Sequence, residues 1–272
     1  MLTCATLAAA LHAAKAGEVL TLAPGQTCTQ VRVVGPPSRE RPATLRLNGA
    51  TIRGLHLLRG AGQLVVEGPG LIEAREGWAG KGPATYAVEL KGVRDVTFRA
   101  LEIREARTGI AVGGGSMRVR IERVRFTGTM LDGITIGAGR EVEVRDSVFE
   151  LTKTPDRRHG DAIQWWGEAT DRITVVGNRL RLRGGMQGIG GLGPRPEGLE
   201  VRIEDNVIDT DTFRAISVAR EKAVVRNNRV GDGDPRKLAS IFMGPMVQAC
   251  GNVALDHQAA RRPAPEWTRP CR

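Results

Sequence analysis

The chain has 272 residues, with 35 glycines, only 4% aromatic residues and a formal net charge of +10 at pH 7. This excess of Lys and Arg favours a polyanionic partner. The basic residues are scattered, with no zinc-finger spacing and no aromatic RNA-binding signature, so we expect no nucleic-acid partner. No apolar stretch approaches the length of a membrane span, so we expect no membrane insertion either.

The N-terminal segment is expected to form a helix followed by a turn. Residues 6–17 carry apolar side chains at helical spacing, and Gly17 is a typical helix stop. The segment 1–18 lacks the basic start and the unbroken apolar run of a signal peptide. We therefore expect a capping helix over 1–17, and a signal already removed if the protein is exported.

Four cysteines flank the chain, Cys4 and Cys28 near the start and Cys250 and Cys271 near the end. They allow three pairings, of which local pairing would staple each terminus. Disulfides would indicate an oxidising compartment, and hence a secreted or periplasmic protein. Buried free thiols in a cytosolic protein are the alternative.

A repeat runs through almost the whole chain. Its segments carry apolar residues at the first, third, sixth and eighth positions, and they recur at a basic step of about 22–24 positions with occasional insertions. The segments are 45–52, 64–72, 96–103, 119–126, 142–149, 173–180, 201–208, 223–230 and 247–254. Such a period is typical of a solenoid, and the alternation indicates two short strands that meet at a corner.

A third short strand follows in most repeats, which makes a coil of three strands. These strands are expected at 87–90, 109–112, 133–136, 162–165, 188–191, 215–218 and 240–243. The sixth position of the later repeats is Asn178, Asn206, Asn228 and Asn252, after Ser147 one coil earlier. Asn tolerates left-handed backbone, and its amide can bond the same residue one coil away, so a stacked Asn ladder is expected. The pattern predicts a parallel β-helix.

The stretch "LAAALHAAKAGEVLTLAPGQ" (7–26), followed by Asn-bearing coils, resembles the pectin-lyase-like superfamily. The resemblance covers about 6–254 and implies an all-β, single-domain right-handed parallel β-helix of about nine to ten coils. Its parts would be the capping helix (1–17), the β-helix (18–254) and a C-terminal cap or tail (255–272). The superfamily contains lyases, hydrolases, epimerases and non-catalytic spike proteins, so the resemblance is specific for fold rather than activity.

Candidate site residues follow from the coil register. A small residue opens each third strand, which indicates either tight coil packing or a ligand close to the backbone. Two outward columns gather polar groups, and these are Asp132, Asp161, Gln187 and Arg214 beside Thr135, Gln164 and Ser217. Insertions border this face and carry Lys153, Arg157 and Arg158. A basic groove of this kind suits an acidic polysaccharide, with Trp166 stacking on a sugar ring and Trp165 in the core.

Asp132 and Asp161 occupy the same position in adjacent coils, so their Cα atoms should lie about 5 Å apart. Carboxylates this close share a cation, share a proton, or divide acid and nucleophile roles. Ca²⁺ is the natural cation for such oxygen ligands. His159 is an alternative candidate base, with a pKa near neutrality.

Three functions remain open. In pectate-lyase-like enzymes, acidic residues on this face hold Ca²⁺ against a uronate, which implies metal-binding roles for Asp132 and Asp161 and a neutralising or basic role for Arg214. The first prediction is therefore a polysaccharide lyase that cleaves an acidic polysaccharide by β-elimination. Segments 131–136 and 160–165 also resemble the Asp-bearing segments of polygalacturonase-like hydrolases, although Gly160 stands where a second Asp is expected. A non-catalytic glycan-binding or spike protein is the third possibility, and a monomer is expected throughout.

Overall fold

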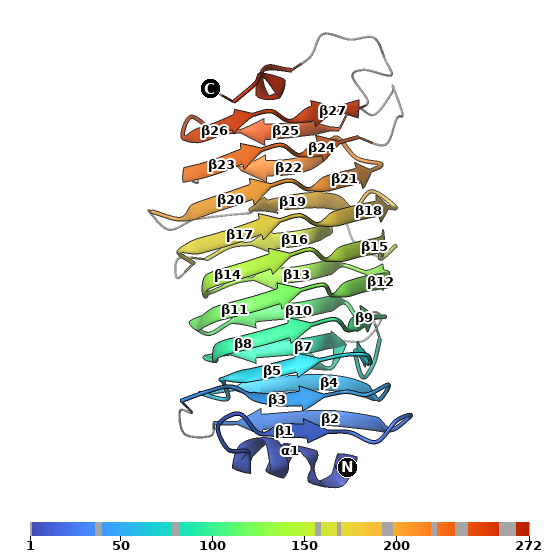
Figure 1. The fold of residues 1–272 in the computed structure, drawn as a ribbon. Coiled ribbons are helices and arrows are strands. Elements are labelled where there is room, and N and C mark those ends of the chain that lie inside the picture. Colours follow the sequence, from blue (N-terminus) through green and yellow to red (C-terminus); the bar gives the residue numbers. More distant parts are fainter. Residues whose placement is uncertain are drawn as a thin grey trace.

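The structure, a computed structural model, describes residues 2–35, 40–77, 82–155, 159–167, 170–191, 198–218, 222–231, 239–255 and 265–271. Within these ranges the chain forms a right-handed parallel β-helix of about nine turns, with an α-helix at its N-terminal end (Figure 1). This confirms the predicted fold class. The apolar repeats become stacked strands because successive side chains of a strand point to opposite faces, so one set of each coil faces the core.

One face of the solenoid is a ten-stranded parallel sheet, here called the front sheet. Its strands, in order, are β1 (Val19–Thr21), β3 (Ala43–Arg46), β5 (Leu64–Glu67), β8 (Arg94–Arg99), β11 (Ser116–Glu122), β14 (Gly139–Arg145), β17 (Arg172–Val176), β20 (Glu200–Glu204), β23 (Lys222–Arg226) and β26 (Val247–Cys250). Its inward columns are apolar, as in the stacked Val96, Val119, Val142 and Ile173.

The other two faces share a second parallel sheet. In the first coils β2 (Thr27–Val34) and β4 (Thr51–Leu58) run through both faces. Later coils divide into second strands, namely β6 (Leu71–Glu73), β9 (Glu102–Arg104), β12 (Arg125–Met130), β15 (Val148–Lys153), β18 (Arg179–Arg183), β21 (Val207–Thr210), β24 (Arg229–Val230) and β27 (Val253–Ala254). The third strands are β7 (Tyr86–Lys91), β10 (Thr108–Gly113), β13 (Asp132–Ile136), β16 (Asp161–Trp165), β19 (Gln187–Gly191), β22 (Arg214–Val218) and β25 (Ser240–Met243). We call the surface of these third strands the site face.

A buried Asn ladder holds the corner between the first and second strands of each later coil. The amide nitrogen of Asn178 donates to Oδ1 of Asn206 at 3.0 Å, and the same bond joins Asn206 to Asn228 and Asn228 to Asn252 at 2.9 Å. We expected the Asn itself to adopt the left-handed conformation at this corner. Instead the residue before it does so, for example Asp205 with φ of 56°. The Asn is therefore selected for its amide, which satisfies backbone groups of neighbouring coils.

The column of small residues on the site face has a packing cause. A Cβ placed on Gly109 would lie 2.5 Å from the carbonyl oxygen of Gly133, and one on Gly133 would lie 2.5 Å from that of Ala162. Ala87 and Ala162 in the same column are fully buried. The backbone of the next coil, rather than a ligand, is what lies close to these residues.

Both ends of the solenoid are covered and cross-linked. Helix α1 (Cys4–Ala13) buries Leu7 and Leu11, and the Cys4–Cys28 disulfide ties it to β2 in the first coil (Figure 1). At the other end, the Cys250–Cys271 disulfide joins β26 to a tail whose short 3-10 helix η2 (Glu266–Thr268) buries Trp267. The local pairing is confirmed, and two disulfides fit an extracellular or periplasmic location. None of the helices that the structure describes is both long and apolar enough to cross a membrane.

Candidate functional site

The site face carries two buried carboxyl groups on neighbouring strands. Asp132 begins β13 and Asp161 begins β16, and the relative exposures of these residues are 8% and 3%. The backbone N–H of Asp161 donates to Oδ1 of Asp132 at 3.1 Å. The structure therefore brings the two acids together as the coil register requires.

A hydrogen-bonded network surrounds Asp161. Oδ2 of Asp161 lies 2.6 Å from Nε2 of His159, and it also accepts a bond from the amide nitrogen of Gln164. The other ring nitrogen of His159, Nδ1, lies 3.1 Å from the amide nitrogen of Gln187. The hydrogen bond to Asp161 raises the pKa of His159 above its ordinary value. Held near Asp161 through Nε2 and near Gln187 through Nδ1, His159 is placed to orient the Asp161 carboxylate.

Asp132 has a different electrostatic environment. Its pKa is raised to about 7, chiefly by burial and also by the neighbouring Asp161 carboxylate. The N–H of Asp161 acts in the opposite direction, as do the more distant charges of His159 and Arg107. Asp132 can therefore hold a proton near neutral pH, which is the property required of a general acid.

A pocket of about 500 Å³ opens on the site face beside Asp132. Its floor comes from the outward side chains of β7, β10 and β13, and its rim comes from the short helix η1 (Gly82–Thr85) and from Trp166. The lining includes Thr85, Tyr86, Glu89, Lys91, Arg107, Thr108, Ala111, Gly113, Asp132, Thr135, Gly137 and Trp166. Asp132 lies at one end of a pocket that extends over the coils before it.

Small residues explain why the pocket is hollow. Lys91, Gly113, Gly137 and Trp166 hold one position in four successive coils, so two glycines separate the two large side chains. The Trp166 ring lies over Gly137, where an added Cβ would be 3.1 Å from the indole nitrogen. Trp166 is 40% exposed and offers an aromatic wall to the pocket, whereas Trp165 is fully buried in the core as predicted.

Several predicted residues lie away from this pocket. Ser217 is in register with Gly190, which is in register with Gln164, so it lies two strands beyond Gln164. The guanidinium of Arg214 lies 5.3 Å from the centre of the Phe213 ring, and the pairing of β22 with β25 is irregular just after Arg214. Lys153 donates to the carbonyl of Thr154. The predicted binding residues Arg157 and Arg158 lie outside the described part of the chain.

Sequence reasoning missed the two cations of the pocket, Arg107 and Lys91. Arg107 immediately precedes β10, and its carbonyl accepts from the N–H groups of Leu131 and Asp132. Lys91 ends β7 and pairs with the buried Glu89. Arg107 could have been found, because the equivalent residues of the neighbouring coils, Thr85 and Leu131, are uncharged.

The donor set at Asp132 and Asp161 does not fit a calcium site well. Ca²⁺ takes six to eight oxygen ligands, as a rule including several carboxylates. Here one oxygen of Asp161 is held by His159 and Gln164, and one oxygen of Asp132 accepts the Asp161 N–H. Across the described ranges, no group of three or more His, Cys, Asp or Glu side chains is placed to hold a metal ion. The chemistry proposed below therefore rests on these side chains alone.

No family model matches the chain, and no curated protein or solved structure shows significant similarity to it. The class of this protein is therefore defined only by its fold and its site. It is a parallel β-helix protein with two intrachain disulfides and with a pair of acidic residues beside a pocket. This fold is compatible with carbohydrate-active proteins and with spike-like proteins. The resemblance to the pectin-lyase-like superfamily extends to the β-helix and no further.

Proposed function

We propose that the protein is a carbohydrate-active enzyme that cleaves an acidic polysaccharide in the Asp132 pocket, by acid-assisted hydrolysis. The observation that carries this proposal is the pair of unlike acids. Asp132 is buried at the pocket with a pKa raised to about 7, while the adjacent Asp161 is bound to His159 at 2.6 Å. Two carboxyl groups whose environments differ in this way divide the acid and base roles of glycoside hydrolysis.

In the proposed reaction, protonated Asp132 donates its proton to the glycosidic oxygen as the bond from that oxygen to the anomeric carbon breaks. Water adds to the anomeric carbon, and the Asp161 carboxylate takes the proton that the water loses. His159 and Gln164 hold Asp161 in place through its Oδ2. The preference for an acidic chain rests on Arg107 and Lys91, and Trp166 supplies an apolar surface for a sugar ring.

β-Elimination by a lyase is the second candidate, and the cations of the pocket favour it. Arg107 and Lys91 line the same hollow as Asp132 and could neutralise a uronate carboxylate, which acidifies the adjacent C5 proton. The role first expected of Arg214 would pass to Arg107, because Arg107 lines the pocket and Arg214 does not. If elimination also required Ca²⁺, chelation with EDTA would abolish it.

A panel of polyuronates distinguishes these functions. Hydrolysis releases new reducing ends without ultraviolet absorbance of unsaturated products, whereas elimination releases both. Asp132→Asn should abolish either reaction, and Asp209→Asn, on the outer side of β21, is the matched control that should not. Binding without any product would contradict an enzymatic function and support a glycan-binding protein.

A further inference from the structure

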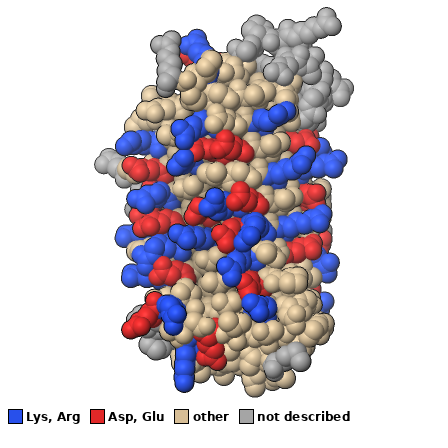
Figure 2. All heavy atoms as spheres, viewed as in Figure 1, with Lys and Arg blue, Asp and Glu red and all other residues tan. Residues whose placement is uncertain are grey.

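The front sheet carries ladders of alternating charge on its outer surface. One column reads Asp95, Arg118, Glu141, Arg172, Glu200 and Lys222 from coil to coil, each in or directly next to the paired register. A second column, further along each strand, reads Arg46, Glu67, Arg99, Glu122, Arg145, Val176, Glu204 and Arg226. Figure 2 shows the resulting alternation of basic and acidic rows across this face. Opposite charges on adjacent strands stabilise the stack, whereas like charges would destabilise it.

The alternation of the second column breaks at β17, whereas the first column continues through Arg172. Val176 lies between Arg145 and Glu204, and Thr174 lies between Glu143 and Arg202 in the column between the two ladders. A charge of either sign at Thr174 or Val176 would lie beside one like charge, which explains the neutral residues. Thr174 and Val224 flank Arg202 in this middle column, and the surface is hollowed beside these two short side chains.

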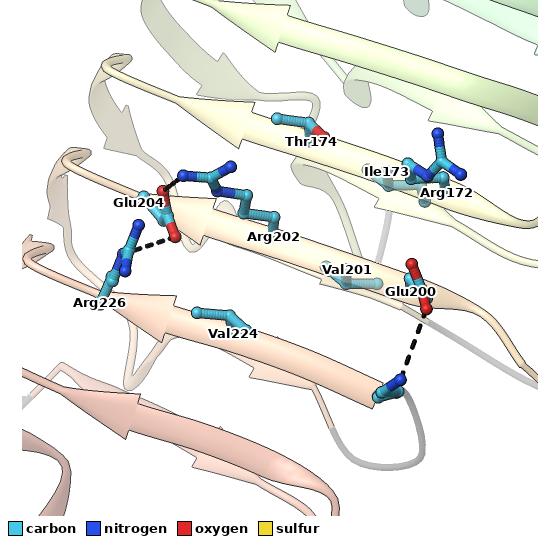
Figure 3. Close-up of a pocket in the computed structure, with 10 residues that line it drawn as sticks. Arg172, Ile173, Thr174, Glu200, Val201, Arg202, Glu204, Val224 and Arg226 are labelled. Carbon is cyan, nitrogen blue, oxygen red and sulfur yellow. Dashed lines mark ion pairs between the residues drawn. The ribbon is translucent and has the colours of Figure 1, made fainter.

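Two adjoining hollows result, and they meet at Arg172, Thr174 and Arg202. The larger, of about 490 Å³, is lined by Arg172, Ile173, Thr174, Glu200, Val201, Arg202, Glu204, Lys222, Val224 and Arg226 (Figure 3). The smaller, of about 320 Å³, continues toward Arg118 and Arg120 on β11. Together they extend across four strand spacings from β11 to β23, which is about 19 Å along the solenoid. A ligand that fills both must be extended.

The larger hollow has an excess of positive charge. Four cations and two carboxylates line it, and these are Arg172, Arg202, Lys222 and Arg226 with Glu200 and Glu204. Arg172 forms no ion pair with any residue that the structure describes, although the other Arg and Lys residues of the lining do. Its guanidinium is therefore available to an external anion.

A buried carboxylate orients the remaining arginines. Glu204 is only 2% exposed, and its two oxygens bind Arg202 and Arg226 at 2.6 Å each (Figure 3). The two guanidinium groups are fixed in place while roughly half of each side chain stays exposed. Preorganised guanidinium groups are the usual partners of carboxylate and sulfate groups.

We propose that these joined hollows are a second binding site for an acidic polysaccharide, in which Arg172 and Arg202 contact its carboxylate or sulfate groups. The choice of ligand class rests on the proposed function, but the two sites share no residues. The second site would hold a polymer on the front sheet while the site face acts on another segment or another chain. The ligand is extended because the hollow is, and anionic because its lining is basic.

Calorimetric titration with an oligogalacturonate at low salt tests this site, in the Asp132→Asn background so that nothing is cleaved. Two sites per chain are expected. Arg172→Gln should weaken one of them about tenfold, as loss of one charge-assisted contact does. Thr174→Glu should do the same by placing a carboxylate in the hollow. Arg179→Gln is the matched control, because Arg179 is also exposed and lies on β18.

The outcomes separate the two sites. Weakening by Arg172→Gln but not by Trp166→Ala would support the second site and count against the pocket of the proposed function. Unchanged binding in both Arg172→Gln and Thr174→Glu would overturn the second site. Inorganic sulfate, titrated alone, must bind far more weakly than the oligosaccharide, since equal affinity would mean a site for a small anion instead of a polymer.

Discussion

The front sheet and the site face use the same coil spacing but treat carboxyl groups in opposite ways. On the front sheet, Asp95 accepts two hydrogen bonds from Arg118 in the next strand, and these lower its pKa. On the site face, Asp132 has Thr108 on one side and Asp161 on the other, and burial beside a second acid raises its pKa to about 7. The strand spacing that stabilises unlike charges on adjacent strands also destabilises like charges. The protein keeps such a destabilising pair of acids where the pocket opens.

The candidate site departs from the rule that holds on the front sheet, where carboxyl groups lie beside opposite charges of adjacent strands. In the ladders, Glu67, Asp95 and Glu204 each pair with an Arg of a neighbouring coil and need no ligand. Asp132 has no such partner among the described residues of the neighbouring coils, and it lines a hollow rather than a filled surface. Residues that reduce stability and line a cavity are candidates for chemistry.

The largest expected effect is that of Asp132→Asn. Loss of the proton donor should reduce polysaccharide cleavage by at least about 100-fold. The same substitution should raise the free energy of unfolding. The folded pKa lies above the unfolded one, so ionised Asp132 lowers stability increasingly as pH rises from about 4 to about 7. Asn keeps an oxygen for the Asp161 N–H and removes the charge, so the free energy of unfolding at pH 8 should rise by up to about 4 kcal/mol.

Urea unfolding of both proteins at pH 4 and pH 8 checks this prediction, and the gain should vanish at pH 4. Asp209→Asn is the control, because it removes a carboxylate that is paired with Arg183 and should bring no such gain. A destabilised Asp132→Asn protein at pH 8 would show that the carboxylate does not reduce stability.

Glu204→Gln should have the opposite sign, because Glu204 belongs to the ladder. The substitution removes two charge-assisted hydrogen bonds to Arg202 and Arg226, for a net loss of about 2 kcal/mol in the free energy of unfolding. Chemical denaturation at pH 8 measures the change. An increase in stability would mean that the desolvation of the Glu204 carboxylate destabilises the fold by more than its two ion pairs stabilise it.

A cation placed beside Asp132 would give this carboxyl group the environment of the carboxylates in the charge ladders, with an opposite charge on the adjacent strand. Thr108 is in register with Asp132 and lines the pocket, so Thr108→Arg should lower the pKa of Asp132 by at least about one unit. Wild-type activity should fall as pH rises through about 7, because the acid loses its proton, and the variant should lose activity at correspondingly lower pH. The pH–rate profile is the measurement, with Thr108→Val as the uncharged control. An unshifted alkaline limb in Thr108→Arg would exclude Asp132 as the proton donor.

The smallest effect is expected of Glu200→Gln. The Glu200–Lys222 pair spans 3.5 Å between two largely exposed side chains. Such pairs contribute less than about 1 kcal/mol, so the melting temperature should hardly move. A loss as large as that of Glu204→Gln would show that the ladder acts as a cooperative network rather than through its buried members.

Much of the fold could be predicted from local patterns. The third strands β7, β10, β13, β16, β19 and β22 each begin just before the predicted stretch. The outward column that contains Thr135, Gln164 and Ser217 also lies in one register, as expected. The adjacency of Asp132 and Asp161 followed from the same register. The direction in which the pocket extends could not be predicted from the register. It depends on which side chains of neighbouring coils are long and on where Trp166 lies.

The sequence by itself determined the parallel β-helix, its capping helix, the Asn ladder and the positions that share a face. It could do so because periodic burial and strand pairing depend on the order of residues alone. Tertiary structure decided which cysteines pair, that the pocket extends toward Arg107 and Lys91 rather than Arg214, and that Val176 of β17 interrupts the second charge ladder. These features depend on the volumes and charges of side chains from different coils, which are distant in the sequence and come together only when the solenoid is stacked.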